Sequence, residues 1–188
     1  MNQLIYALSE LHDRIFNAIE DATEGWLLGF AARLVFPATL LVYFWTSGLT
    51  KIGEGLFGFL SPSDGAYIQI FPKAFEEAGY DSSAFGFVPD MIVLFGTWAE
   101  FILPLLIVIG LFTRLSALAF IGFICVMSYV DIYGHGADAA TIGAFFDKDA
   151  SSLISDQRLF WGFLMLVLVI KGAGKISIDA LLSSRNSL

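Results

Sequence analysis

The stretch FGTWAEFILPLLIVIGLFTRL, residues 95–115, decides the fold because it is too apolar for the surface of a soluble domain. It lies in a run, residues 88–111, that is long enough to cross the roughly 30 Å hydrocarbon core of a bilayer as a helix. At about 1.5 Å per residue, Glu100 lies about 18 Å from Val88, near the middle of that core. Arg114 follows in a short turn. We therefore predict a membrane-spanning helix that carries one intramembrane acid.

The composition of the whole chain agrees with this stretch. Of its 188 residues, 57% are hydrophobic, and the mean hydropathy is +0.75. Soluble domains contain roughly 45–50% apolar residues. We predict an all-α membrane fold, a four-transmembrane-helix bundle over residues 28–182, followed by a tail, 183–188. The predicted spans are 28–49, 88–111, 115–133 and 158–172.

Two segments outside the spans also have recognisable patterns. Residues 1–27 form an amphipathic N-terminal helix, because leucines and isoleucines recur at helical spacing against acidic residues. We expect this helix to lie on the membrane surface or on the bundle. The connection between the first two spans, residues 51–88, is rich in aromatic residues that suit the membrane interface. It is predicted to form short interfacial helices that cover one end of the bundle.

Among the glycines of the predicted spans, Gly96, Gly122 and Gly162 lie away from the ends of their spans. Small residues let membrane helices approach each other closely. We therefore predict that these glycines lie at helix–helix contacts.

Charge and cysteine content exclude several classes of function. The net charge of −8 argues against a nucleic-acid partner, which would need a basic surface. The single cysteine, Cys125, excludes an intrachain disulfide and a CxxC motif. The two histidines, His12 and His135, are far apart in sequence. A metal or haem site built from several imidazoles or thiolates is therefore not expected.

The orientation of the chain follows from its basic residues. Four spans place both termini on one side of the membrane. That side carries six lysines and arginines, and the other side carries four. By the positive-inside rule, both termini are predicted to be cytoplasmic. Arg114 is then a basic anchor at a short inside turn.

Three stretches together are similar to the DoxX family of small four-helix membrane proteins. They are RLVFPATLLVYFWTSGLTKI (33–52), WAEFILPLLIVIGLFTRLSAL (98–118) and GAGKISIDALL (172–182). The first ends in the G-x-x-K element, here Gly48 to Lys51; the second contains the central acid and its turn; the third is similar to the closing signature. The resemblance implies a bundle in the bacterial cytoplasmic (inner) membrane. Members of the family are subunits of a thiosulfate:quinone oxidoreductase or resemble partners of thiol and redox enzymes, so the implied cofactor is a quinone.

Glu100 is the main candidate for a functional residue. An ionised carboxylate at this depth costs several kcal/mol unless it is paired, so it should face the interior of the bundle. The functional hypothesis is a proton acceptor or a ligand of a bound headgroup. The alternative is a structural role, in which Glu100 is hydrogen-bonded to a neighbouring span.

Other polar residues fall on helical stripes that can face Glu100. The candidate binding-pocket residues are Tyr43, Ser47, Lys51, Thr97, Asp131 and His135. They predict a polar pocket in the outer half of the bundle, with Glu100 as its floor and the aromatic connection as its lid. Simpler alternatives remain open: Lys51 extends to the interface, Asp131 is a helix cap or an interfacial acid, and His135 is an ordinary surface residue.

The leading functional hypothesis is a membrane subunit of a redox assembly that offers a site to a quinone or a small sulfur compound. If the protein is an enzyme, it is a subunit of a quinone-linked oxidoreductase and not a self-contained one. The first alternative is a non-catalytic membrane anchor or assembly partner of a larger complex. The weaker alternative is a small proton-linked transporter. The expected partners are the lipid bilayer and either another protein or further copies of the chain.

Overall fold

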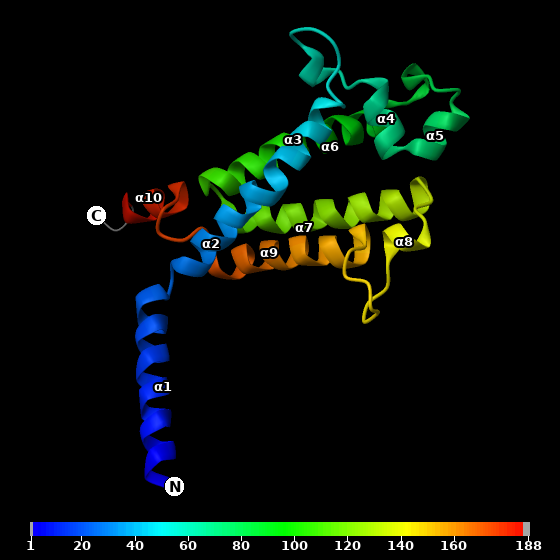
Figure 1. Cartoon of the computed structure of the whole chain (residues 1–188). Helices are drawn as coiled ribbons and strands as arrows, with labels where there is room; N and C mark the ends of the chain where they lie inside the picture. The colour runs from blue at the N-terminus through cyan, green and yellow to red at the C-terminus, as the bar shows by residue number, and fades with distance from the viewer. Residues whose placement is uncertain (1, 186–188) are drawn as a thin grey trace.

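The computed structural model describes residues 2–185 and is helical throughout its regular segments (Figure 1). The helical segments are α1 (Asn2–Thr23), α2 (Leu27–Phe36), η1 (Pro37–Leu41), α3 (Val42–Leu49), η2 (Gly58–Leu60), α4 (Asp64–Ile70), α5 (Pro72–Glu77), η3 (Ser82–Ala84), α6 (Phe87–Ile109), α7 (Thr113–Tyr129), η4 (Val130–Gly134), α8 (Ala139–Ile142), η5 (Leu153–Gln157), α9 (Arg158–Lys171) and α10 (Ile178–Arg185). Of the predicted tail, 183–185 belong to α10, and 186–188 lie outside the described residues.

Four helices are long and apolar enough to cross a membrane, which confirms the predicted fold class. They are Leu27–Leu49, Phe87–Ile109, Thr113–Gly134 and Leu153–Lys171. The first three agree closely with the predicted ranges. The fourth begins at Leu153 and not at Arg158, because a π-helical turn, η5, continues directly into α9. Asp156 stabilises the start of η5 by accepting hydrogen bonds from the backbone N–H and the hydroxyl of Ser152.

The four spans form two arms that diverge toward one end of the molecule (Figure 1). Near the α6–α7 turn, α2 packs against both α6 and α9, so the bundle is closed there. Beyond η1, α3 packs on α6 and forms the first arm, and α9 packs on α7 and forms the second arm. We call the end at the α6–α7 turn the closed end and the other the open end. Both α1 and α10 adjoin the closed end (Figure 1).

Aromatic packing between the first and third spans forms the centre of the core. Phe36, Phe44 and Phe120 are each fully buried. The ring centroids of Phe36 and Phe120 lie 5.3 Å apart, and those of Phe44 and Phe120 lie 4.8 Å apart, both edge to face. This is the geometry that the quadrupoles of aromatic rings favour. These contacts hold the first span against the third, from α2 into the first turn of α3.

The connection between the first two spans contains the short helices that were predicted. Tyr67 of α4 and Phe75 of α5 are buried on Val93 of α6. The Tyr67 hydroxyl donates a hydrogen bond to Asp90 at 2.8 Å. These contacts fix α4 and α5 beside the open end of the bundle (Figure 1).

Arg33 ties the closed end together. Its guanidinium donates to the carbonyls of Ile107 (3.1 Å) and Val108 (2.7 Å) at the end of α6. It also donates to the carbonyls of Ala173 (3.0 Å) and Ile176 (2.6 Å) in the loop that follows α9. Carbonyls in the last turn of a helix lack partners within that helix. Arg33 therefore supplies donors to α6 and fixes the loop against it.

The prediction for the three glycines is only partly right. A Cβ added to Gly122 or Gly162 would meet no other described atom within 4 Å, so neither glycine lies at a close helix contact. A Cβ on Gly96 would lie 3.2 Å from Ile70, in the short helix α4. Within the four spans, the closest approach that requires a glycine is at Gly29 of α2, where a Cβ would collide with the backbone carbonyl of Gly172.

The N-terminal helix α1 leaves the bundle at a turn near Gly25, which has a φ of 74°. It then runs away from the bundle, across the direction of the spans (Figure 1). Its apolar side chains are exposed; Leu8, for example, is 57% exposed. The structure therefore does not place α1 on the bundle, which is one of the two expected locations, and its location on the membrane surface stays a prediction.

Candidate functional site

A buried ion pair joins the two helices of the first arm. Lys51, which follows α3, places its Nζ 3.0 Å from both carboxylate oxygens of Glu100 in α6. Ser47 Oγ accepts a hydrogen bond from Lys51 Nζ at 2.8 Å and donates one to Glu100 Oε1 at 3.2 Å. The side chains of Lys51 and Glu100 are only 5% and 6% exposed. This pairing is what allows a charged group to lie so deep in an apolar span.

A second ion pair joins the two helices of the other arm. Arg158, the first residue of α9, donates from Nη2 to Asp131 in η4 and from Nη1 to Ser128 Oγ at 3.0 Å. The Arg158 side chain is 3% exposed. Both Asp131 and Arg158 lie at or beside π-helical turns. Such turns change the helical register locally and are frequent at functional sites.

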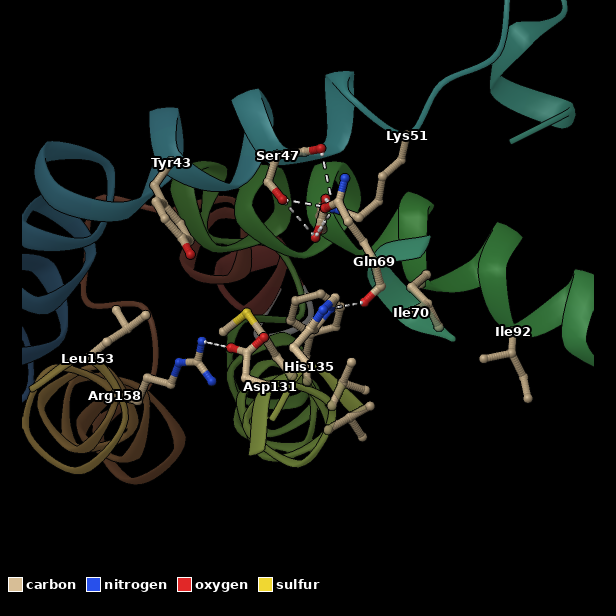
Figure 2. A pocket seen from close by; sticks show the side chains of 16 residues that line it. Tyr43, Ser47, Lys51, Gln69, Ile70, Ile92, Asp131, His135, Leu153 and Arg158 are labelled. Atoms are coloured by element: carbon tan, nitrogen blue, oxygen red, sulfur yellow. Dashed lines mark hydrogen bonds and ion pairs between the residues drawn. The ribbon is translucent and has the colours of Figure 1, made fainter. Parts of the chain in front are cut away.

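The two ion pairs line one cavity of about 410 Å³ between the arms. Figure 2 shows Ser47 and Lys51 on one side of this space and Asp131 and Arg158 on the other. The polar residues that line it are Tyr43, Ser47, Lys51, Gln69, Glu100, Asp131, His135 and Arg158. The apolar residues are Ile70, Ile92, Phe123, Val126, Met127, Val130 and Leu153, with Gly96. We call this space the charged cavity.

The short helix α4 connects both arms at the edge of the charged cavity. Gln69 Nε2 donates to Thr50 Oγ1 at 3.0 Å, at the end of α3. The Gln69 carbonyl lies 3.1 Å from His135 Nε2, just after η4 (Figure 2). Because a carbonyl only accepts, His135 donates this hydrogen bond from Nε2. Gln69 therefore positions the aromatic connection over the open end of the cavity.

One donor that belongs to the charged cavity has no partner. Arg158 Nε is buried and makes no hydrogen bond to any residue in the described part of the chain, 2–185. A buried N–H without an acceptor costs about 1–3 kcal/mol, more when the group is charged. An acceptor oxygen from outside the chain would satisfy this donor, so the cavity is a candidate ligand site.

The structure brings most of the candidate residues together. Glu100, Tyr43, Ser47, Lys51, Asp131 and His135 all line the charged cavity. Lys51 does not extend freely to the interface, since it is 4% exposed and paired with Glu100. Whether these residues act on a ligand stays a prediction.

The prediction for Thr97 is wrong, because this residue does not line the charged cavity. Its hydroxyl donates to the Val93 carbonyl at 2.8 Å, and the residue borders a separate apolar pocket. The face of α6 that lines the charged cavity runs through Ile92, Gly96 and Glu100, which are spaced by four residues. One residue after Gly96 the helix has turned by about 100°, so Thr97 points elsewhere.

Two polar residues of the cavity are not among the predicted ones, Arg158 and Gln69. In the sequence, Arg158 counts only as one of the four basic residues on the outer side of the membrane. A signal for its true position exists in the sequence: Asp131 is an acid in an apolar span and needs a cation at similar depth. Gln69 has no comparable signal, because its location depends on how a loop folds back on the bundle.

The four spans and the polar groups between them define a multi-pass integral membrane protein with a charged site between its helices. The chain belongs to the DoxX family, whose model matches residues 30–131, more than half of its length. The match contains both partners of the Lys51–Glu100 pair and extends to Asp131. No match was found among curated proteins or among solved structures.

Proposed function

We propose that the charged cavity binds the headgroup of a quinone, and that this DoxX protein is a membrane subunit of a redox assembly in the bacterial cytoplasmic membrane. The observation that carries the proposal is the two salt bridges, one buried and one partly buried, that line one cavity from opposite arms. Each provides a cationic donor beside a carboxylate. A further donor, Arg158 Nε, has no partner among residues 2–185.

The residues present fit a quinone headgroup. The headgroup is a flat apolar ring with a carbonyl oxygen on each of two opposite edges. Arg158 would hold one of these oxygens through Nε, and Lys51 would hold the other in exchange for one of its two contacts with Glu100. Phe123 and Met127 would contact the ring. A cavity of about 410 Å³ falls in the range of small-molecule sites, roughly 300–1,000 Å³.

The chain would also manage protons at this site. A bound quinone supplies two-electron redox chemistry, in which two electrons and two protons convert it to the quinol. Glu100, whose carboxylate Lys51 and Ser47 keep in one orientation, would take up protons from the open end and pass them to the quinone oxygens. Asp131, whose side chain is 30% exposed, connects the cavity to the open end. The two electrons come from a partner subunit that oxidises a small sulfur compound.

The test is quinone binding by the intact protein. The full chain is purified from bacterial membranes in mild detergent, and its bound quinone is extracted and quantified by mass spectrometry. Rebinding of a short-chain ubiquinone or menaquinone is then measured for wild type, Glu100→Gln and Arg158→Lys. Arg158→Lys removes the Nε donor to the headgroup, and Glu100→Gln removes the carboxylate that positions Lys51, so affinity should fall about 10- to 100-fold in each variant.

Thr97→Val is the matched control, because Thr97 lies on the same helix as Glu100 but outside the cavity. It should bind quinone like the wild type. Wild-type protein that carries no quinone and binds none would refute the proposed function. Equal losses in Thr97→Val and Glu100→Gln would show that the effect is not specific to the cavity.

A second candidate function, that of an assembly partner, is favoured by α1. This 22-residue helix runs away from the bundle (Figure 1). Its apolar side chains, such as Leu8 and Leu11, are exposed. If α1 docks a partner protein, deletion of residues 2–23 should abolish copurification of a stoichiometric partner in mild detergent. Glu100→Gln should leave that copurification unchanged.

A further inference from the structure

A second pocket lies at the closed end, on the opposite side of the core from the charged cavity. Its volume is about 640 Å³, and it is formed by the start of α7, the loop that follows α9, and α10. Three exposed basic side chains line it, Arg114, Lys171 and Lys175. We call it the basic pocket. The proposed function uses none of these residues.

The loop that borders the basic pocket is fixed by the rest of the fold. Gly172 and Gly174 both have a φ of 76°, a left-handed conformation that favours glycine. Between and after them, the carbonyls of Ala173 and Ile176 accept hydrogen bonds from the buried Arg33. Lys171 and Lys175 flank this loop, so they extend from a backbone of defined geometry.

Arg114 approaches the same loop from α7. A Cβ added to Gly172 would lie 3.3 Å from Arg114 Nε, so the guanidinium packs directly against the glycine. Among residues 2–185, none of the three basic side chains takes part in an ion pair. Three unpaired cations therefore converge on one rigid loop.

One acid, Asp179, also lines the basic pocket. Its carboxylate already accepts hydrogen bonds from the backbone N–H groups of Phe112 (2.8 Å) and Thr113 (2.9 Å). Asp179 thus caps the N-terminus of α7, and its single negative charge offsets only one of the three positive charges. The pocket keeps a net positive charge.

Thr113 gives an independent indication of a ligand. This residue is fully buried, lines the basic pocket, and has a hydroxyl without a hydrogen-bond partner in the part of the chain that the structure describes. It begins α7, a 17-residue helix whose N-terminus carries a partial positive charge. A hydroxyl donor, a positive helix end and three cations together match an oxygen-rich anion.

We propose that the basic pocket binds the phosphate group of an anionic phospholipid. The pocket lies where the third span begins, at Thr113, and the fourth ends, at Lys171, which is the level of the lipid headgroups. Basic pockets between membrane helices at this level bind anionic headgroups. Inorganic phosphate has the same chemistry, but lipid phosphate is concentrated at this level.

The test uses the full chain after removal of its native lipids in a neutral detergent. Native mass spectrometry titrates it separately with phosphatidylglycerol, phosphatidylcholine and inorganic phosphate. The wild type should bind one phosphatidylglycerol at least ten times more tightly than phosphatidylcholine. The triple variant Arg114→Gln, Lys171→Gln, Lys175→Gln should lose roughly 100-fold in phosphatidylglycerol affinity, about five-fold for each cation.

A matched control removes the same charge elsewhere, in Arg14→Gln, Lys73→Gln, Lys148→Gln, three exposed basic residues outside the pocket. This control should keep the preference for phosphatidylglycerol. Thr113→Val, which changes no charge and little volume, should weaken phosphatidylglycerol binding several-fold while the elution profile stays that of the wild type.

Three results would overturn the proposal. They are no preference of the wild type for phosphatidylglycerol, equal losses in the two triple variants, and displacement of the lipid by millimolar inorganic phosphate. The last result would identify a site for a soluble anion. The wild-type comparison needs no substitution, so it decides the matter even if a variant fails to fold.

Discussion

Lys51 and Glu100 form a two-oxygen ion pair across the first arm, with Nζ 3.0 Å from each carboxylate oxygen and both side chains almost wholly buried. The pair links the end of the first span to the middle of the second. It also places a charged group on the wall of the charged cavity. Its structural and functional roles can be separated, because stability and ligand binding are measured independently.

We expect Lys51→Met and Glu100→Gln each to destabilise the protein strongly. Removal of one partner leaves a buried charge uncompensated, which costs about 3–5 kcal/mol. The double variant should be less destabilised than the sum of the two single variants, because no unpaired charge remains. Denaturant unfolding in detergent measures the cycle. Strict additivity of the two losses would contradict a direct pairing of Lys51 with Glu100.

Arg33→Lys should lower the melting temperature although the charge is retained. A lysine has donors on one atom only and cannot reach the α6 carbonyls and the loop carbonyls together, as Arg33 does. With about two hydrogen bonds lost, at roughly 1 kcal/mol each, the melting temperature should fall by roughly 4–8 °C. Arg14→Lys on exposed α1 is the control and should melt like the wild type. Equal melting of both variants would argue against the bridging role of Arg33.

Asp179→Asn should destabilise the start of α7 by about 0.5–2 kcal/mol, the usual range for loss of a helix cap. Each oxygen of the carboxylate accepts one backbone N–H, from Phe112 or Thr113, and an amide can replace only one of them. Hydrogen exchange should therefore become faster at the start of α7 and in α10. Unchanged exchange in both segments would contradict the assigned role of Asp179.

Tyr67 should make stability depend on pH in the alkaline range. Burial, together with the hydrogen bond to Asp90, raises the pKa of Tyr67 to about 12. An unfolded tyrosine has a pKa of about 10. Because the folded pKa is the higher one, the stabilisation is complete below pH of about 10 and is lost as the pH rises through 12.

The measurement for Tyr67 compares thermal unfolding of wild type and Tyr67→Phe at several pH values between 9 and 12. The wild type should lose more stability than the variant over this range, since only the wild type can ionise at this position. Parallel curves for the two proteins would show that the Tyr67 pKa is not raised in the folded state.

Gly29→Ala and Gly122→Ala should have different effects on the free energy of unfolding. A methyl group on Gly29 would collide with the Gly172 carbonyl, whereas one on Gly122 meets open space within 4 Å. We expect Gly29→Ala to destabilise by about 1–3 kcal/mol, as overpacking does, and Gly122→Ala to be neutral or slightly stabilising. Thermal unfolding in detergent gives both values. A neutral Gly29→Ala would contradict the close approach of α2 to the loop.

The membrane fold is predictable from the sequence because it rests on local properties. The length and hydropathy of the four apolar runs indicate four helices, and the structure confirms them. The main difference in their limits is at Leu153, where a π-helical turn extends the fourth span into a segment that contains Ser155 and Asp156. Hydropathy alone does not indicate a helix here, because it counts every polar side chain as unfavourable. It does not register that Asp156 is hydrogen-bonded to Ser152.

The candidate site is only partly predictable. The helical stripes that contain Ser47, Lys51 and Asp131 indicate residues that can face a common space, and these residues do line one cavity. The prediction for Thr97 is wrong because a helix offers two neighbours to Glu100 on its preceding turn, Thr97 three residues before it and Gly96 four residues before it. These two lie on different sides of α6, and Gly96 is the one that lines the cavity. Only contacts with neighbouring helices decide which of the two sides is turned inward.

The sequence by itself determined that this chain crosses a membrane four times and carries an intramembrane acid. These features follow from hydrophobic transfer and helix length, which are properties of each segment alone. The tertiary structure decided that Lys51 pairs with Glu100, that Asp131 pairs with Arg158, and that the two pairs share a cavity. Pairing depends on how the arms diverge and on the register that π-helical turns impose. Both arise from packing between segments distant in the chain, so no single segment encodes them.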